Sequence, residues 1–191
     1  DLIHQQRTQP NQRQQQGLNF PTDARVILIT AHRRENFGEG IQNICNAVEY
    51  LAHEHANVHF VWPVHLNPAV HDVVYAQFAA HAQIHLVQPL DYPSLLAVID
   101  RAEFILTDSG GIQEESPSFH KPVLILRETT ERPEVVTVGA GILVGTDQEK
   151  IVREAERLLM DQVHYTAMAH APNPFGDGKA SQRILDQIAQ A

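Results

Sequence analysis

The sequence predicts an α/β fold in which a parallel sheet of about six strands carries helices on both faces. Two observations predict this fold. Short apolar runs rich in β-branched residues have the length of buried strands, and they alternate with segments whose apolar residues recur at helical spacing. Strands separated by helices pair in parallel, because each crossover helix returns the chain to the same end of the sheet and covers one face.

The predicted strands are short apolar runs with the length and the β-branched content of buried strands. They lie at residues 25–30, 58–62, 84–87, 104–107, 122–126 and 141–144. Three of the segments between or after them carry the apolar stripe of a helix that packs on a sheet. The stripes are Ile41, Ile44, Cys45, Val48 and Leu51; Leu95, Leu96, Val98 and Ile99; and Ile151, Ala155, Leu158 and Leu159.

The chain has 191 residues, of which 43% are hydrophobic, enough for one ordinary globular core. Residues 1–21 are rich in glutamine, so we expect a linker or the end of a preceding element there, and a domain over residues 22–191. The sequence does not begin with methionine. We therefore expect it to be a piece of a longer protein whose other part lies upstream of Pro21.

Composition argues against several classes of protein. The formal net charge of −9 has the wrong sign for a protein that binds nucleic acid through its phosphates. We expect no membrane span, because no apolar run approaches the roughly 18 residues needed. The single Cys45 cannot form an internal disulfide, in keeping with a reducing, cytoplasmic location. The twelve histidines are scattered without an HExxH spacing, so we expect no metal site.

In a parallel α/β sheet, ligands bind outside the carboxyl ends of the strands, so function is expected in the residues that follow each strand. The first strand is followed by His32, Arg33 and Arg34. Guanidinium groups offer several donors to a phosphate, and imidazole adds a hydrogen bond or transfers a proton. The alternative is a solvated loop in which Arg34 and Glu35 pair with neighbours.

The fourth strand is followed by Thr-Asp-Ser-Gly-Gly, residues 107–111. Gly110 and Gly111 let a ligand approach the main chain, and the first N–H groups of a following helix favour an anion. The spacing fits neither the P-loop nor the dinucleotide motif. One helical turn further on, Glu114 and Glu115 would repel a phosphate, and a carboxylate there is better suited to the hydroxyl groups of a ribose. The alternative is a plain turn whose acidic residues favour the helix dipole.

Two further strand ends carry polar residues. After the fifth strand, Thr129, Thr130 and Arg132 are placed to complete a diphosphate site that faces the glycine turn. A helix start with Thr130 as cap and Glu134 in the first turn is compatible with that role. After the second strand, Asn67 and Pro68 predict a helix start, and the sequence leaves open whether the nearby His65 contacts a ligand.

The motifs together resemble one family. The stretches AHRREN, PVHLNP, TDSGGIQEESP, KPVLILRETTERPE and NPFGDGKASQRI occur in the order and at the spacing found in the C-terminal half of bacterial non-hydrolysing UDP-N-acetylglucosamine 2-epimerases. The resemblance covers residues from about 22 to 191. It implies one of the two Rossmann-like domains of a GT-B type fold, whose active site lies in the cleft between the domains.

The resemblance also implies an activity. Members of the family interconvert UDP-GlcNAc and UDP-ManNAc by eliminating UDP to give 2-acetamidoglucal and then adding UDP back. They use neither a nicotinamide nor a metal, and so no cofactor is expected. They are usually homodimers. The carboxylates that serve as acid and base lie in the N-terminal domain, so this chain alone is expected to bind nucleotide without turnover.

The family's site residues map onto positions of this sequence. The resemblance implies that His32 is catalytic and that UDP is bound by Ser109, Gly110, Gly111, Glu115 and Arg132. It implies that Arg33 and His65 help to bind a second, regulatory UDP-GlcNAc. Many members stack a phenylalanine on uracil where this sequence has Leu95, which implies plain apolar contact instead. Three alternatives stay open: a GT-B glycosyltransferase domain, a hydrolysing epimerase that releases ManNAc and UDP, and a non-enzymatic nucleotide-sugar sensor.

Overall fold

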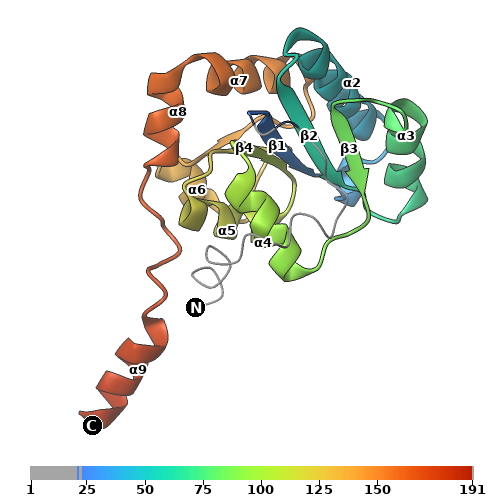
Figure 1. The fold of residues 1–191 in the computed structure, drawn as a ribbon. Helices are drawn as coiled ribbons and strands as arrows, with labels where there is room; N and C mark the ends of the chain where they lie inside the picture. Colours follow the sequence, from blue (N-terminus) through green and yellow to red (C-terminus); the bar gives the residue numbers. More distant parts are fainter. Residues whose placement is uncertain (1–20, 22, 191) are drawn as a thin grey trace.

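The computed structural model describes residue 21 and residues 23–190, and it confirms the six-stranded parallel sheet (Figure 1). The linker expected over residues 1–21 lies almost wholly outside the described residues. The strands are β1 (Arg25–Thr30), β2 (Val58–Pro63), β3 (Ile84–Val87), β4 (Phe104–Thr107), β5 (Val123–Ile125) and β6 (Gly141–Leu143). Each lies within one residue of a predicted apolar run at both ends.

The helices lie between and after the strands. They are α2 (Glu39–Glu54), α3 (Pro68–Phe78), α4 (Tyr92–Arg101), α5 (Gly110–Glu115), α6 (Pro133–Thr137), α7 (Gln148–Met160), α8 (Gln162–Ala169) and α9 (Ala180–Ala189). The 3₁₀ turn η2 (Arg34–Asn36) follows β1, and the 3₁₀ turn η3 (Ser116–Phe119) follows α5. No helix in the described part of the chain is both long and apolar enough to cross a membrane.

The inner strands of the sheet, β1, β2, β4 and β5, are buried on both faces, which explains their largely apolar sequences. In β1, Ile27 and Ile29 belong to the larger core that includes residues of α2, α3, α7 and α8. Val26 and Leu28 point the other way, into a core shared with α4 and α5. Helices therefore cover both faces, as predicted (Figure 1).

The predicted start of α3 is confirmed, because the Asn67 side chain accepts a hydrogen bond from the Ala69 N–H at 3.0 Å and Pro68 is the first helical residue. At the other end of the chain, α9 extends away from the sheet and has no buried residue (Figure 1). Its exposed aliphatic side chains are Ile184, Leu185 and Ile188.

The strand order is β3-β2-β1-β4-β5-β6, which places the reversal of the chain's winding between β1 and β4. The two strands end level with each other, since Thr30 pairs with Thr107 in the register and their hydroxyl oxygens are 2.5 Å apart. Sheets of this order bind ligands at such a reversal. Because His32 and Ser109 lie two residues beyond these threonines, the topology brings the two strongest predicted site segments together.

Candidate functional site

Asp108 joins the loops that follow β1 and β4. Its side chain is fully buried, and its Oδ2 accepts hydrogen bonds from the backbone N–H of His32 at 2.8 Å and of Arg33 at 2.7 Å. The Asn36 side-chain amide donates a third bond at 3.1 Å. A buried carboxylate is stable only when such donors replace water. Asp108 thus fixes the position of the predicted His32–Arg33 segment, a role that the sequence analysis missed.

His32 lies between Asp108 and His65. Its Nδ1 is 3.2 Å from Asp108 Oδ1, an oxygen with no well-aligned hydrogen-bond partner among the described residues. The His32 ring stacks on that of His65, with ring centres 5.6 Å apart, and its side chain is 37% exposed. His65 Nδ1 in turn accepts the Asn67 N–H at 3.1 Å. The residue predicted to be catalytic therefore adjoins one predicted to be regulatory.

Nothing in the described part of the chain explains the Gly110–Gly111 pair. Neither glycine has the positive φ that favours glycine, and a Cβ atom built on Gly110 would meet nothing within 4 Å. A Cβ on Gly111 would find only the Ser109 Oγ, at 3.9 Å. Alanine would also favour the helix that begins here. The open space beside these glycines is thus available to a group that does not belong to the described chain.

A cavity of about 200 Å³ opens beside this turn. It combines polar groups from the ends of β1, β2 and β4 with apolar groups from the segment before α4 and from α4 itself. Leu95, the position predicted to meet uracil, is part of this wall. The lining residues are Thr30, His32, Pro63, His65, Pro89, Leu90, Leu95, Ser109 and Ile112.

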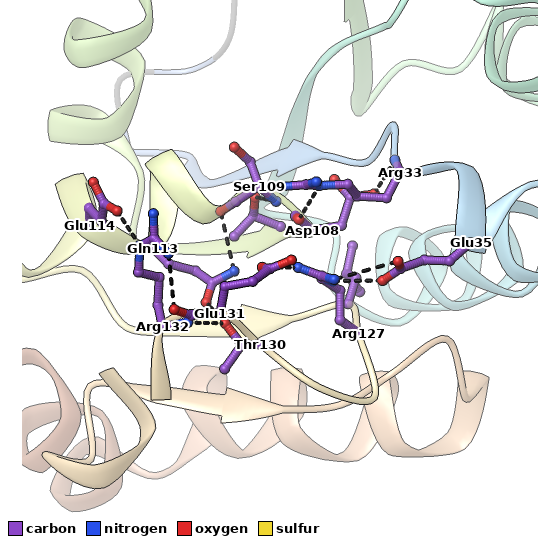
Figure 2. A network of polar contacts seen from close by, with 12 residues as sticks. Arg33, Glu35, Asp108, Ser109, Gln113, Glu114, Arg127, Thr130, Glu131 and Arg132 are labelled. Carbon is purple, nitrogen blue, oxygen red and sulfur yellow. Dashed lines mark hydrogen bonds and ion pairs between the residues drawn. The ribbon is translucent and has the colours of Figure 1, made fainter. Parts of the chain in front are cut away.

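The loop after β5 contacts α5 (Figure 2). The fully buried Gln113 accepts a hydrogen bond from the Thr130 hydroxyl at 2.5 Å and donates one to the Ser109 carbonyl at 3.3 Å. Arg132 forms an ion pair with Glu114. The positive charge of Arg132 therefore offsets the negative charge of Glu114, which would repel a phosphate if it were unpaired. Of the three residues predicted to face the Ser109 turn, Thr130 and Arg132 therefore contact α5.

The prediction that Thr130 caps the next helix is wrong. The N-cap of α6 is Arg132, which makes no side-chain capping bond, and Glu134 occupies the first turn as expected. The Thr130 hydroxyl instead accepts the Arg132 N–H at 3.0 Å, one residue before the helix begins. The hydroxyl is thereby turned toward Gln113, so Thr130 connects the β5 loop to α5 rather than starting α6.

Arg127 ties the β1 loop to the β5 loop. Its guanidinium is buried and pairs with Glu35, at 2.6 Å from Nε to Oε1, and with Glu131 (Figure 2). The hydrogen bond from Arg127 lowers the pKa of Glu131 to about 2. Glu35 therefore has a partner, as the alternative for the first strand end expected, but that partner is a buried arginine 92 positions away in the sequence.

Replacing Glu131 with glutamine is expected to destabilise the chain at neutral pH and to have less effect in acid. The folded-state pKa of Glu131 lies below the ordinary value of 4.5, so its contribution to stability is fully present above about pH 4.5. That contribution is lost as the pH falls toward 2. Thermal unfolding of both proteins between pH 7 and 2 measures this. A difference in Tm that stays constant over this range would contradict the prediction.

Glu115 is held by a tyrosine. The Tyr92 hydroxyl donates to Glu115 Oε1 at 2.7 Å, and this bond is the main cause that raises the Tyr92 pKa to about 12. Glu115 lies four residues after Gly111 on α5, which places both on the same helix face. A ligand at the glycine turn therefore has a carboxylate about one helical turn away. Tyr92 was not singled out by the sequence analysis.

No cluster of three or more histidine, cysteine, aspartate or glutamate side chains in the described part of the chain has the arrangement of a metal site. The polar groups at the strand ends are instead arginine, amide, hydroxyl and backbone N–H donors together with carboxylates. Donors of this kind suit an anionic group, and carboxylates suit hydroxyl groups. The site can therefore hold a molecule that carries both.

The fold and the position of the site define a Rossmann-like domain of the kind that makes up one half of a GT-B protein. A sequence model of the UDP-N-acetylglucosamine 2-epimerase family matches residues 1–189. The chain belongs to this family. The UDP-N-acetylglucosamine 2-epimerase of Escherichia coli K12 is 47% identical over 179 residues, which are 92% of this chain and 48% of that protein.

Two solved structures are also similar to this chain. The UDP-GlcNAc 2-epimerase of Neisseria meningitidis, bound to UDP-GlcNAc, is 38% identical with a TM-score of 0.90, over 100% of this chain and 52% of that one. The Staphylococcus aureus MnaA–UDP co-structure is 46% identical with a TM-score of 0.83, over 87% of this chain and 46% of that one. The chain thus spans about half the length of the relatives it matches.

Proposed function

We propose that this chain is the C-terminal, UDP-binding domain of a non-hydrolysing UDP-GlcNAc 2-epimerase that interconverts UDP-GlcNAc and UDP-ManNAc. Membership of the family carries the proposal. The site geometry supports it, because the open glycine turn, the carboxylate one helical turn away and the apolar cavity wall suit a diphosphate, a ribose and a base in that order.

The proposed reaction eliminates UDP from the sugar. A base removes the C2 proton, the bond from C1 to the diphosphate oxygen breaks, and 2-acetamidoglucal and UDP form. UDP then adds back to C1, and a proton returns to the opposite face of C2. Negative charge develops on the departing diphosphate, and fixed donors stabilise such charge. We assign that role to Arg132, to Ser109 and to the N–H groups of Gly110 and Gly111, with His32 beside the leaving group.

We assign the remaining steps to an N-terminal domain outside this chain. Removal of the C2 proton requires a positioned base. The carboxylates that the family uses for this purpose belong to the other half of the two-domain fold. The chain alone should therefore bind UDP without turnover. Arg33 and His65 are the proposed contacts of a regulatory UDP-GlcNAc, and the stacked His32 and His65 rings give the two sites a direct contact.

Product analysis of the full-length protein, meaning this chain with its N-terminal domain, tests the proposal. Incubation with UDP-GlcNAc, followed by NMR of the sugar signals, is expected to show UDP-ManNAc at equilibrium with the substrate. Free ManNAc and UDP would instead identify a hydrolysing enzyme. Transfer of the sugar to an added acceptor would identify a glycosyltransferase, and binding without any product would identify a sensor.

Replacing Glu115 with alanine is expected to weaken UDP binding by about tenfold, or roughly 1.4 kcal/mol, because the ribose hydroxyls lose a charged acceptor. Ser109→Ala should also weaken it. Calorimetric titration of UDP into the full-length protein measures both changes. The control is Glu149→Ala in the first turn of α7, outside the site, which should bind UDP as the wild type does. Unchanged binding by both site variants would contradict the assignment.

A further inference from the structure

We propose that Tyr92 is a positioning residue that holds the Glu115 carboxylate for the ribose hydroxyls of UDP, so that the pair selects ribonucleotides. The inference rests on the proposed function and adds to it a residue and a specificity. Nothing in the UDP-binding set of Ser109, Gly110, Gly111, Glu115 and Arg132 requires a tyrosine at the start of α4.

The start of α4 fixes the position of Tyr92. Tyr92 is the first residue of α4, and Asp91 before it caps that helix by accepting the Ser94 N–H at 2.9 Å. Pro93 further restricts the backbone of this turn. The Tyr92 hydroxyl then reaches across to the last residue of α5 and donates to Glu115 Oε1 at 2.7 Å. A capped helix start therefore holds a carboxylate that belongs to a different helix.

The chemistry of the pair leaves one oxygen available. An ionised carboxylate only accepts hydrogen bonds. Tyr92 occupies Oε1, while Oε2 has no hydrogen-bond partner within residues 23–190. Ribose hydroxyls are donors that fit this oxygen. A glutamate side chain has several rotatable bonds, so a fixed partner lowers the entropy lost when a ligand binds.

The ionisation state of the phenol supports the same assignment. The hydrogen bond to Glu115, together with partial burial, raises the Tyr92 pKa to about 12. A phenol is already protonated at neutral pH, and this shift keeps Tyr92 protonated at higher pH as well, so it acts as a donor toward the carboxylate. It does not compete with the carboxylate for the ribose as a second anion.

The spacing along α5 places the pair where a ribose would lie. Glu115 follows Gly111 by four residues, a rise of about 6 Å along one helix face. The ribose of a nucleoside diphosphate lies next to the phosphates. A diphosphate bound at the glycine turn therefore brings its ribose toward Glu115, and the contact with Tyr92 comes from the side of α4.

The test compares UDP with 2′,3′-dideoxy-UDP, which lacks both ribose hydroxyls, in calorimetric titrations of the full-length protein. Tyr92→Phe should weaken UDP binding by about three- to tenfold, in line with one lost hydrogen bond, and should leave dideoxy-UDP binding unchanged. Tyr50→Phe is the matched control, because Tyr50 is 44% exposed on α2 and Tyr92 is 45% exposed. It should bind both nucleotides as the wild type does.

Other outcomes would overturn the inference. An equal loss of affinity for both nucleotides would show that Tyr92 acts on the base or on the fold. Unchanged affinity for both nucleotides would show that the Tyr92 hydroxyl does not act in the site. The double variant with Glu115→Ala should bind UDP no more weakly than Glu115→Ala alone, and additive losses would show that the two residues act separately. If the wild type did not bind UDP, the proposed function would fail too. If Glu115→Ala weakens binding and Tyr92→Phe does not, only this inference fails.

Discussion

Replacing Gly111 with alanine is expected to leave the domain at least as stable as before and to weaken UDP binding by about 100-fold, or roughly 3 kcal/mol. The stability follows from space and backbone conformation, since the new Cβ would meet only Ser109 Oγ at 3.9 Å. Alanine in place of a helical glycine adds about 0.5–1 kcal/mol. The binding loss follows because the methyl group would occupy the space proposed for the diphosphate.

Thermal unfolding of the chain and UDP titration of the full-length protein measure the two effects separately. Gly141→Ala is the matched control, because a Cβ there would lie 3.2 Å from Ile125 Cδ1 and 3.3 Å from Val135 Cγ1. That variant should lose stability and keep the UDP affinity of the folded protein. A Gly111→Ala protein that is as stable as the wild type and binds UDP equally well would show that the diphosphate does not bind at this turn.

Much of the fold was predictable because the four inner strands, β1, β2, β4 and β5, are buried on both faces. Residues such as Ile27 and Leu28 point to opposite cores, so the whole strand must be apolar and reads as a continuous run. The order of the strands was not predictable in this way. It depends on which apolar edges pair in space, and the composition of β1, β2 and β4 is too similar to decide it.

The rim of the site was predictable from one rule, that ligands bind at the carboxyl ends of parallel strands. The rule located His32 and Ser109, and the register of β1 and β4 brings them together. The partners within the site could not be predicted. The Arg127–Glu35 pair spans 92 positions in the sequence, and a charge pattern shows which groups are present without showing which of them meet.

Local reasoning also failed where a side chain had two possible partners. Thr130 had the pattern of a helix cap, yet its hydroxyl bonds to Gln113 and accepts the Arg132 N–H. Gln113 is 17 positions away in the sequence. The helix begins at Pro133 with Arg132 as its N-cap, so Thr130 lies two residues before the cap and its hydroxyl makes both of its hydrogen bonds outside the helix.

Replacing Asp108 with asparagine is expected to preserve the fold and UDP affinity while lowering the turnover of the full-length enzyme by about 100-fold or more. The asparagine oxygen can occupy the position of Oδ2 and accept the N–H groups of His32 and Arg33 as before. Its NH₂ group then faces His32 Nδ1, which is 3.2 Å from Oδ1 in the wild type. That nitrogen must become an acceptor, which moves the ring proton to Nε2.

Steady-state kinetics with UDP-GlcNAc and ¹⁵N NMR of the His32 ring test this prediction together. The expected result is a large fall in kcat with little change in KM, accompanied by a changed protonation pattern of the ring nitrogens. Asp108→Ala is the contrasting variant, because it leaves the backbone N–H groups of His32 and Arg33 without their acceptor and leaves the Asn36 amide with only the Leu126 carbonyl. It should cost about 3 kcal/mol of stability and displace the loop after β1. Wild-type kcat in Asp108→Asn would show that the carboxylate only supports the loop, whereas a selective loss of kcat would show that it also sets the protonation of the proposed catalytic histidine.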